Sequence, residues 1–207
     1  MDRRLFLAST GVGAVMAMNV PLPLFAQEAA DAAVEVTEMV IGNPDAEVEV
    51  IEYASYTCPH CANFHQSVYP TLKSDFIDTG LIKFVYREVY FDRFGLWASM
   101  VARCGGEQRF FGLTKMLYEK QREWTAGGDP VAIAENLRNL GKVSGLTDEL
   151  LDGCMTDAAK AQALVDWFQQ NTEDDGINST PSFVINGVKF EGSWDDELIP
   201  AIEAALS

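Results

Sequence analysis

Hydrophobic and polar residues alternate in the first part of the chain in a way that predicts two strands around a helix. From Glu47 to Ala54 the run EVEVIEYA is rich in β-branched and aromatic residues and predicts a strand. Residues 58–78 predict a helix, with Pro59 at its first position, where a missing N–H costs nothing, and Gly80 after its end. The run LIKFVYREVYF, Leu81 to Phe91, predicts a second strand. Together these elements predict a βαβ unit.

The middle of the chain, residues 92–175, changes to helical periodicity. Apolar side chains recur there three and four residues apart, and glycines at 105–106, 127–128 and 145 interrupt them. The apolar positions include Trp97, Met100, Val101, Cys104, Phe110, Leu113, Leu117, Ile133, Leu137, Leu140, Ala161, Leu164, Val165 and Phe168. We therefore expect a block of four or five helices.

The last part of the chain predicts a hairpin and a helix. Two apolar runs, residues 183–185 and 188–190, flank Asn186-Gly187, which is the strongest short hairpin signal. Residues 195–206 then show helical spacing. The predicted plan is α/β: βαβ and ββα portions at 37–91 and 176–207, interrupted by the helical block.

The first 26 residues predict an export signal peptide rather than part of the fold. Arg3 and Arg4 precede a weakly apolar stretch that ends at the small residue Ala26. The run Arg3 to Leu7 also resembles a twin-arginine signal, although Asp2 precedes it and ordinary positive charge is an alternative. An uncleaved membrane anchor is a further alternative, disfavoured by Asn19 and two prolines within the stretch. Residues 27–36, rich in alanine and acidic residues without a period, predict a flexible lead-in.

The charge of the chain excludes some partners. The net charge is −16, and because the first 26 residues carry +1, the remainder is near −17. Such a surface repels phosphate backbones and anionic lipid, so we expect neither nucleic-acid binding nor peripheral attachment to a membrane.

Four cysteines follow the signal segment. An even number in an exported chain favours two disulfides, and spacing favours Cys58 with Cys61 and Cys104 with Cys154. The second pair would close a loop of about 50 residues and stabilise the scaffold. Two separate buried thiols remain the alternative for Cys104 and Cys154.

The run Cys58-Pro59-His60-Cys61 carries the candidate chemistry. Cys58 lies at a helix start, where free N–H groups and the positive end of the helix dipole stabilise a thiolate, the attacking form of the residue. His60 could add a hydrogen bond or positive charge to the same sulfur. Cys61, one turn further, would resolve the mixed disulfide. A zinc site is the alternative, since His65 shares a helical face with both cysteines, but no fourth ligand is evident.

Three segments together carry a resemblance to a known family. The run EYASYTCPHC, the helical block and the run STPSFVING, in this order, resemble the DsbA family of thioredoxin-fold disulfide oxidoreductases, over nearly all of the chain after the signal segment. The resemblance implies a thioredoxin fold interrupted by a helical insertion domain. The additional cysteine pair resembles the subset of members with a second, non-catalytic disulfide.

The resemblance also implies roles for three residues outside the cysteine motif. Pro181 would be a cis-proline opposite the cysteines, and Thr180 would lie beside the Cys58 sulfur, tune it and offer backbone to a substrate segment. Glu52 is in phase with the apolar strand positions and lies six residues before Cys58, as the corresponding acid does in the family. A buried carboxylate there could exchange the Cys61 proton. Lys83 or Arg87 could pair with Glu52, and an exposed acid near a strand end is the alternative.

The function that the sequence predicts is a periplasmic dithiol oxidase that needs no cofactor. Its substrates would be reduced exported polypeptides. A quinone-coupled membrane protein of the DsbB kind would reoxidise it, and it would be a monomer. The alternatives are a disulfide isomerase or reductase and, from a different class, a metal-binding or chaperone module on the same fold. Family isomerases carry an N-terminal dimerisation domain, for which the roughly 20 residues between Ala26 and Glu47 are too few.

Overall fold

A five-stranded mixed sheet forms the centre of the fold. The computed structural model describes residues 34–207, so the predicted signal peptide, its twin-arginine motif and most of the lead-in lie outside the described residues. The strands are β1 (Met39–Gly42), β2 (Val48–Ala54), β3 (Ile82–Glu88), β4 (Ser182–Ile185) and β5 (Val188–Phe190), in the order β1-β3-β2-β4-β5. Strands β2 and β3 are parallel and the other neighbours antiparallel.

The four strands predicted from the sequence are present, and β1 was missed. It pairs with β3, with Met39 opposite Tyr86. Its four residues are too short to show alternation, and they follow the segment that composition marked as a lead-in. The fold prediction is confirmed as a thioredoxin fold with a helical insertion, enlarged by this edge strand.

The predicted single helix over 58–78 is divided into three parts. These are α1 (Pro59–Ser67), α2 (Tyr69–Leu72) and the π-helical turn η1 (Lys73–Ile77). Pro70 has no N–H to donate to the preceding turn, which breaks the regular ladder near Val68. In η1 the backbone hydrogen bonds join residues five apart instead of four. The Asp78 N–H, for example, donates to the Lys73 carbonyl at 2.8 Å.

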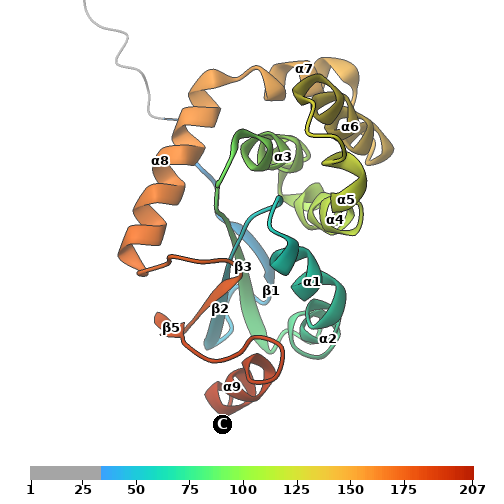
Figure 1. The fold of residues 1–207 in the computed structure, drawn as a ribbon. Helices are drawn as coiled ribbons and strands as arrows, with labels where there is room; N and C mark the ends of the chain where they lie inside the picture. The colour runs from blue at the N-terminus through green and yellow to red at the C-terminus, as the bar shows by residue number, and fades with distance from the viewer. Residues whose placement is uncertain (1–33) are drawn as a thin grey trace, which may run out of the picture. The chain divides into compact units, whose positions relative to one another are not determined.

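Six helices fill the stretch between β3 and β4, one or two more than the periodicity predicted. They are α3 (Arg93–Cys104), α4 (Gly106–Glu119), α5 (Gln121–Trp124), α6 (Pro130–Val143), α7 (Asp148–Met155) and α8 (Ala158–Asp174). The four residues of α5 form a single turn, too short for a periodic signal. Helices α3 to α7 gather beyond the carboxyl ends of β2 and β3, next to the start of α1 (Figure 1).

The two faces of the sheet are covered differently. Alternation along β2 sends Val48 and Val50 to the main core, with α1, α2 and α9 (Leu198–Ala205), and sends Ile51 and Tyr53 to the other face. On that second face Phe168 of α8 packs against a smaller apolar cluster, and Figure 1 shows α8 running along this side of the sheet. Glu52 follows the phase of Val48 and Val50, so its carboxylate belongs to the main core.

Candidate active site

Cys58 begins α1 as its N-cap residue. Its backbone is extended, with φ −78° and ψ 120°, and Pro59 follows at the first helical position, where its ring fits. Both cysteines of the motif are free thiols. The Cys58 side chain is 9 % exposed, whereas Cys61 is fully buried at 0 %. Both cysteines are buried, and Cys58 is the less buried of the two.

The same helix turn moves the pKa values of the two thiols in opposite directions. The pKa of Cys58 falls from 9.0 to about 5, mainly because the Cys61 thiol donates a hydrogen bond to it. Burial opposes this shift, while the Thr180 side chain and the backbone N–H groups of Cys61 and His60 support it. Burial raises the pKa of Cys61 far above its ordinary value, and the negative charges of Cys58 and Glu52 add to the rise. Cys58 is thus the thiolate and Cys61 the protonated thiol.

Thr180 and Pro181 lie against the Cys58 sulfur. The bond between them is cis, and the Cys58 Sγ lies 3.6 Å from the Thr180 carbonyl oxygen. Within the described residues the buried Thr180 hydroxyl has no hydrogen-bond partner. It is therefore free to donate toward the two sulfurs, whose pKa values it lowers.

The side chain of His60 takes a smaller part than the sequence suggested. It is exposed, and it forms no hydrogen bond within residues 34–207. What His60 contributes to the lowered pKa of Cys58 is its backbone N–H at the helix start. Any residue other than proline would supply that group.

Two residues that the sequence analysis missed hold the loop before Cys58. The Gln121 amide donates to the carbonyl oxygens of Tyr56 and Cys58, both at 2.9 Å. The Thr57 hydroxyl donates to Asp92 at 2.8 Å, and Asp92 also caps α3. Gln121 lies among charged residues in a sequence stretch without motif, so only the packing of α5 reveals it. Asp92 could have been recognised as a helix N-cap, but its partner Thr57 could not.

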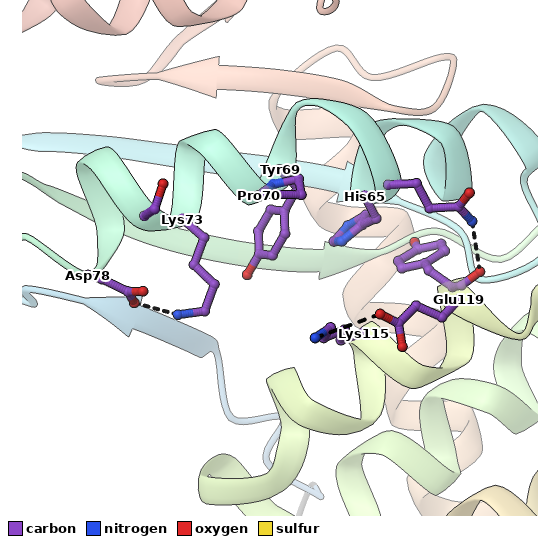
Figure 2. Close-up of a pocket in the computed structure, with 10 residues that line it drawn as sticks. His65, Tyr69, Pro70, Lys73, Asp78, Lys115 and Glu119 are labelled. Carbon is purple, nitrogen blue, oxygen red and sulfur yellow. Dashed lines mark hydrogen bonds and ion pairs between the residues drawn. The ribbon is translucent and has the colours of Figure 1, made fainter.

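Glu52 is buried, and its partner is His65. The carboxylate is 0 % exposed, and both of its oxygens lie 3.0 Å from Nε2 of His65. His65 is on α1, one turn after Cys61, and lies at the edge of a cleft (Figure 2). The expectation that Glu52 pairs with Lys83 or Arg87 is wrong.

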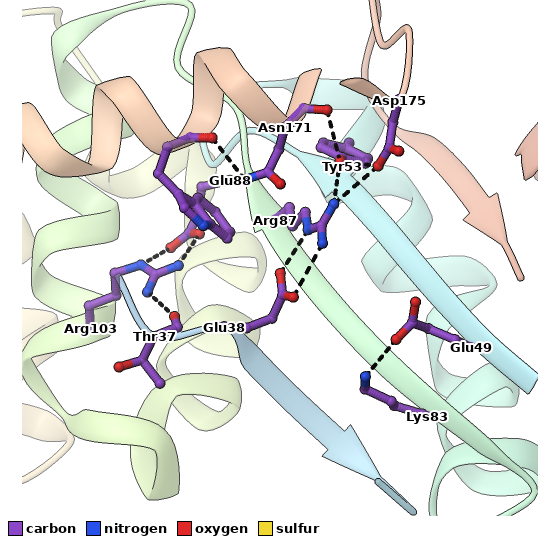
Figure 3. Close-up of polar contacts among 11 residues, drawn as sticks. Thr37, Glu38, Glu49, Tyr53, Lys83, Arg87, Glu88, Arg103, Asn171 and Asp175 are labelled. Atoms are coloured by element: carbon purple, nitrogen blue, oxygen red, sulfur yellow. Dashed lines mark hydrogen bonds and ion pairs between the residues drawn. The ribbon is translucent and has the colours of Figure 1, made fainter. Parts of the chain in front are cut away.

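The register of β2 and β3 explains this correction. Tyr86 is opposite Glu52 and shares its face, whereas Lys83 and Arg87 are opposite Glu49 and Tyr53 on the other face of the sheet. There the Lys83 ammonium lies 2.6 Å from Glu49, and the Arg87 guanidinium lies 2.7 Å from Glu38 and 3.1 Å from Asp175 (Figure 3). A change of one residue along β3 moves a side chain to the opposite layer.

His65 is directed to Glu52 rather than to the cysteines, which removes the third ligand of the zinc alternative. Among residues 34–207, no three His, Cys, Asp or Glu side chains are grouped as a metal site. Cys104 and Cys154 form a disulfide between α3 and α7, with Cα atoms 5.8 Å apart. The pair Cys58 and Cys61 remains as the candidate redox centre.

Comparisons with known proteins agree with this geometry. A family model described as thioredoxin matches residues 34–204. A chain of Rickettsia bellii named a protein-disulfide oxidoreductase is 34% identical over 174 residues, 84% of this chain and 66% of that one. The chain thus spans just under two thirds of that relative's length.

Solved structures show the same fold. The alpha-DsbA1 protein of Wolbachia pipientis has a TM-score of 0.75 and 26% identity, covering 83% of this chain and 92% of that chain. A protein-disulfide isomerase of Novosphingobium aromaticivorans has a TM-score of 0.74 and 26% identity, covering 82% and 97%. In the described part of the chain, no helix has the length and apolar character needed to cross a membrane. The chain therefore belongs to the thioredoxin family, and its fold with an inserted helical domain is similar to that of the Wolbachia pipientis alpha-DsbA1 protein.

Proposed function

We propose that the protein is an exported dithiol oxidase that donates the Cys58–Cys61 disulfide to folding secreted polypeptides. The observation that carries this proposal is the opposite displacement of the two thiol pKa values. A Cys58 pKa of about 5 stabilises the reduced protein at pH 7 by roughly 2 to 3 kcal/mol relative to an unperturbed thiol. This corresponds to about 60 mV of oxidising potential. A protein whose reduced form is stabilised transfers its disulfide to substrate thiols.

The reaction would begin when a substrate thiolate attacks the Cys58 Sγ. A bond forms between the substrate sulfur and Cys58, the Cys58–Cys61 bond breaks, and Cys61 leaves and takes a proton. A second substrate thiolate then attacks the first substrate sulfur, and Cys58 leaves as a thiolate. This departure is favoured by the same contacts that lower its pKa.

The residues around the sulfurs take supporting roles in this proposal. The backbone at Thr180 would pair with an extended substrate segment, placing a substrate cysteine near Cys58. Glu52 would exchange the proton of Cys61, whose pKa its charge raises. The Cys104–Cys154 bridge would hold α3 to α7 and take no part in exchange.

Compartment and partners belong to the same proposal. Residues 1–26 would export the chain to the periplasm, by the twin-arginine or the general route, and the protein would act there as a monomer. A quinone-coupled membrane protein of the DsbB kind would reoxidise it. The likeness to alpha-DsbA1 and to the Rickettsia bellii oxidoreductase supports this assignment.

An isomerase activity is the second candidate, because the Novosphingobium aromaticivorans relative carries that name. Equilibration of the Cys58–Cys61 pair with reduced and oxidised glutathione separates the two. The lowered Cys58 pKa supplies about 60 mV of the roughly 150 mV between thioredoxin and DsbA, and the likeness to alpha-DsbA1 supports the rest. We therefore expect a potential nearer to the about −120 mV of DsbA than to the about −270 mV of thioredoxin. A potential near that of thioredoxin would reject the oxidase direction, and a value near the about −180 mV of protein disulfide isomerase would favour the second candidate.

A further inference from the structure

The buried sulfur of Cys61 must gain or lose a proton in each half of the proposed cycle. Cys61 leaves as a thiolate when a substrate opens the disulfide, and it must become a thiolate again when the disulfide reforms. Its side chain is 0 % exposed, so solvent does not reach it directly. Burial keeps its pKa far above neutral pH, so the proton needs a carrier.

Glu52 and His65 form a hydrogen-bonded pair of proton-exchanging groups, and the charge of this pair's carboxylate is felt at Cys61. The charge of Glu52 acts on Cys61, and its two oxygens lie 3.0 Å from Nε2 of His65. The His65 ring is held between two tyrosines, with its centroid 4.1 Å from that of Tyr118 and 4.5 Å from that of Tyr69. This packing fixes the direction in which the imidazole points.

The second nitrogen of His65 has a different environment. Within the described residues Nδ1 is buried and has no hydrogen-bond partner. His65 lines a cleft of about 530 Å³ between α1–α2 and α4, shown in Figure 2 with Lys115 and Glu119 on its opposite wall. The cleft is large enough for water, which could donate to Nδ1 or accept from it. Because Nδ1 itself is buried, this exchange requires a small movement of the cleft wall.

The other titratable groups around Glu52 and His65 are either held in ion pairs or keep their protons. Tyr69, Tyr86 and Tyr118, which face it from α2, β3 and α4, have raised pKa values because they are buried. Lys73 is paired with Asp78, and the Lys115 ammonium lies 3.7 Å from Glu119. Imidazole is the side chain that exchanges protons most readily near neutral pH.

We propose that His65 is a positioning residue that relays protons between the water of this cleft and Glu52, and through Glu52 to Cys61. This inference rests on the proposed redox function of Cys58 and Cys61. It adds an exit for the proton on the side of α1 away from the substrate. Exchange at Cys61 could then proceed while a bound polypeptide covers Cys58.

The reoxidation half-reaction shows where the proton goes. The Cys58 thiolate attacks oxidised glutathione, forms a mixed disulfide and releases one glutathione thiolate. Cys61 then passes its proton to Glu52, and its sulfur attacks Cys58, which expels the second glutathione thiolate. His65 takes part in the tautomer that carries its hydrogen on Nδ1: Nε2 accepts the proton from Glu52, the Nδ1 proton leaves to water, and the ring ends with its hydrogen on Nε2. Two electrons pass from the two protein thiols to glutathione disulfide.

Single-turnover reoxidation of the full chain by oxidised glutathione tests the relay, with acid quenching and mass analysis of the mixed disulfide. In His65→Gln the amide can still donate to Glu52 but cannot relay. We expect mixed-disulfide formation at the wild-type rate and its resolution by Cys61 at least about tenfold slower at pH 7. This deficit should shrink toward pH 9, because hydroxide replaces the relay.

In His65→Ala, added imidazole should restore the resolution rate. Lys115→Gln, on the opposite wall of the cleft, is the matched control and should resolve like the wild type.

Two kinds of result would contradict the account, one the relay through His65 and the other the redox function. Wild-type resolution in His65→Gln at pH 7, an equal slowing of both steps, or no rescue by imidazole would overturn the relay and leave the redox function in place. Failure of the wild-type protein itself to form the Cys58–Cys61 disulfide with glutathione would instead reject the proposed function.

Discussion

The two cysteine pairs of this protein occupy opposite ends of helices. Cys58 is the N-cap of α1, where backbone N–H groups converge on its sulfur. Cys104 is the last residue of α3 and Cys154 lies in the last turn of α7. The Cys104 Sγ lies 3.4 Å from the Leu150 carbonyl oxygen. A thiolate is stabilised by the first environment and disfavoured by the second, because helix N-termini are positive and C-termini negative.

This difference shows why one pair can be reactive and the other can serve as a constraint. The Cys58–Cys61 pair spans one helical turn, and its two sulfurs differ strongly in burial and pKa. The Cys104–Cys154 pair has a sequence separation of 50 and joins two helices of the insertion. The location of a cysteine relative to a helix end therefore separates the redox pair from the structural pair.

The largest effect should come from removing the nucleophile. Cys58→Ser should lower the rate of dithiol oxidation by at least about a thousandfold, because Cys58 is the less buried of the two free thiols in the described residues and the one with the lowered pKa. The double variant Cys104→Ser, Cys154→Ser should keep the wild-type rate per folded molecule. The assay is oxidation of a reduced peptide dithiol. A double variant that oxidises the dithiol much more slowly than the wild type would show that the Cys104–Cys154 pair takes part in activity.

The structural pair should matter for stability instead. In the chain-entropy description a loop of this length stabilises a fold by about 4 kcal/mol. The double variant should therefore lose about that much free energy of unfolding, measured by urea titration with Cys58 and Cys61 in the same redox state as in the wild type. A loss below about 1 kcal/mol would mean that the helices of the insertion are held without the bridge.

Thr180 should tune the redox pair through its hydroxyl. Thr180→Val keeps the size of the side chain and removes the donor, so the pKa of Cys58 should rise from about 5 and the protein should become a weaker oxidant. Thiolate absorption near 240 nm, followed against pH, measures the shift. An unchanged titration would show that helix-start N–H groups and Cys61 alone set this pKa.

The smallest effect should come from His60. Because its side chain is exposed and its backbone N–H provides the contact, His60→Ala should raise the pKa of Cys58 less than Thr180→Val does. The same titration compares both variants. A larger rise in His60→Ala would restore the role of the imidazole that the sequence suggested.

Much of the site could be predicted because it depends on local sequence. A cysteine followed by proline marks a helix start, and Asn186-Gly187 marks the hairpin that brings Pro181 to the sheet. The phase of Glu52 along β2 predicted its burial, and the structure places it at 0 % exposure. Periodicity and turn signals are properties of neighbouring residues, so one sequence is enough to read them.

The contacts that the sequence did not reveal join segments far apart in the chain. The partner of Glu52 depends on the register between β2 and β3, which decides whether Lys83 and Arg87 share its face. Gln121 reaches the loop at Cys58 across 63 residues of sequence. The edge strand β1 has only four residues and gains its regular structure from pairing with β3. Tertiary packing determines each of these contacts.

The dependence of stability on redox state and pH tests the central claim most directly. Because the pKa of Cys58 is lowered from 9.0 to about 5 in the folded protein, the thiolate stabilises the reduced form fully above pH 9 and loses this effect as the pH falls through about 5. The reduced protein should therefore melt at a higher temperature than the oxidised protein at pH 7. This gap should narrow on acidification and reach its minimum below pH 5. An oxidised protein that melts higher at pH 7, or a gap that does not change with pH, would contradict the assignment of Cys58 as the stabilised thiolate of an oxidant.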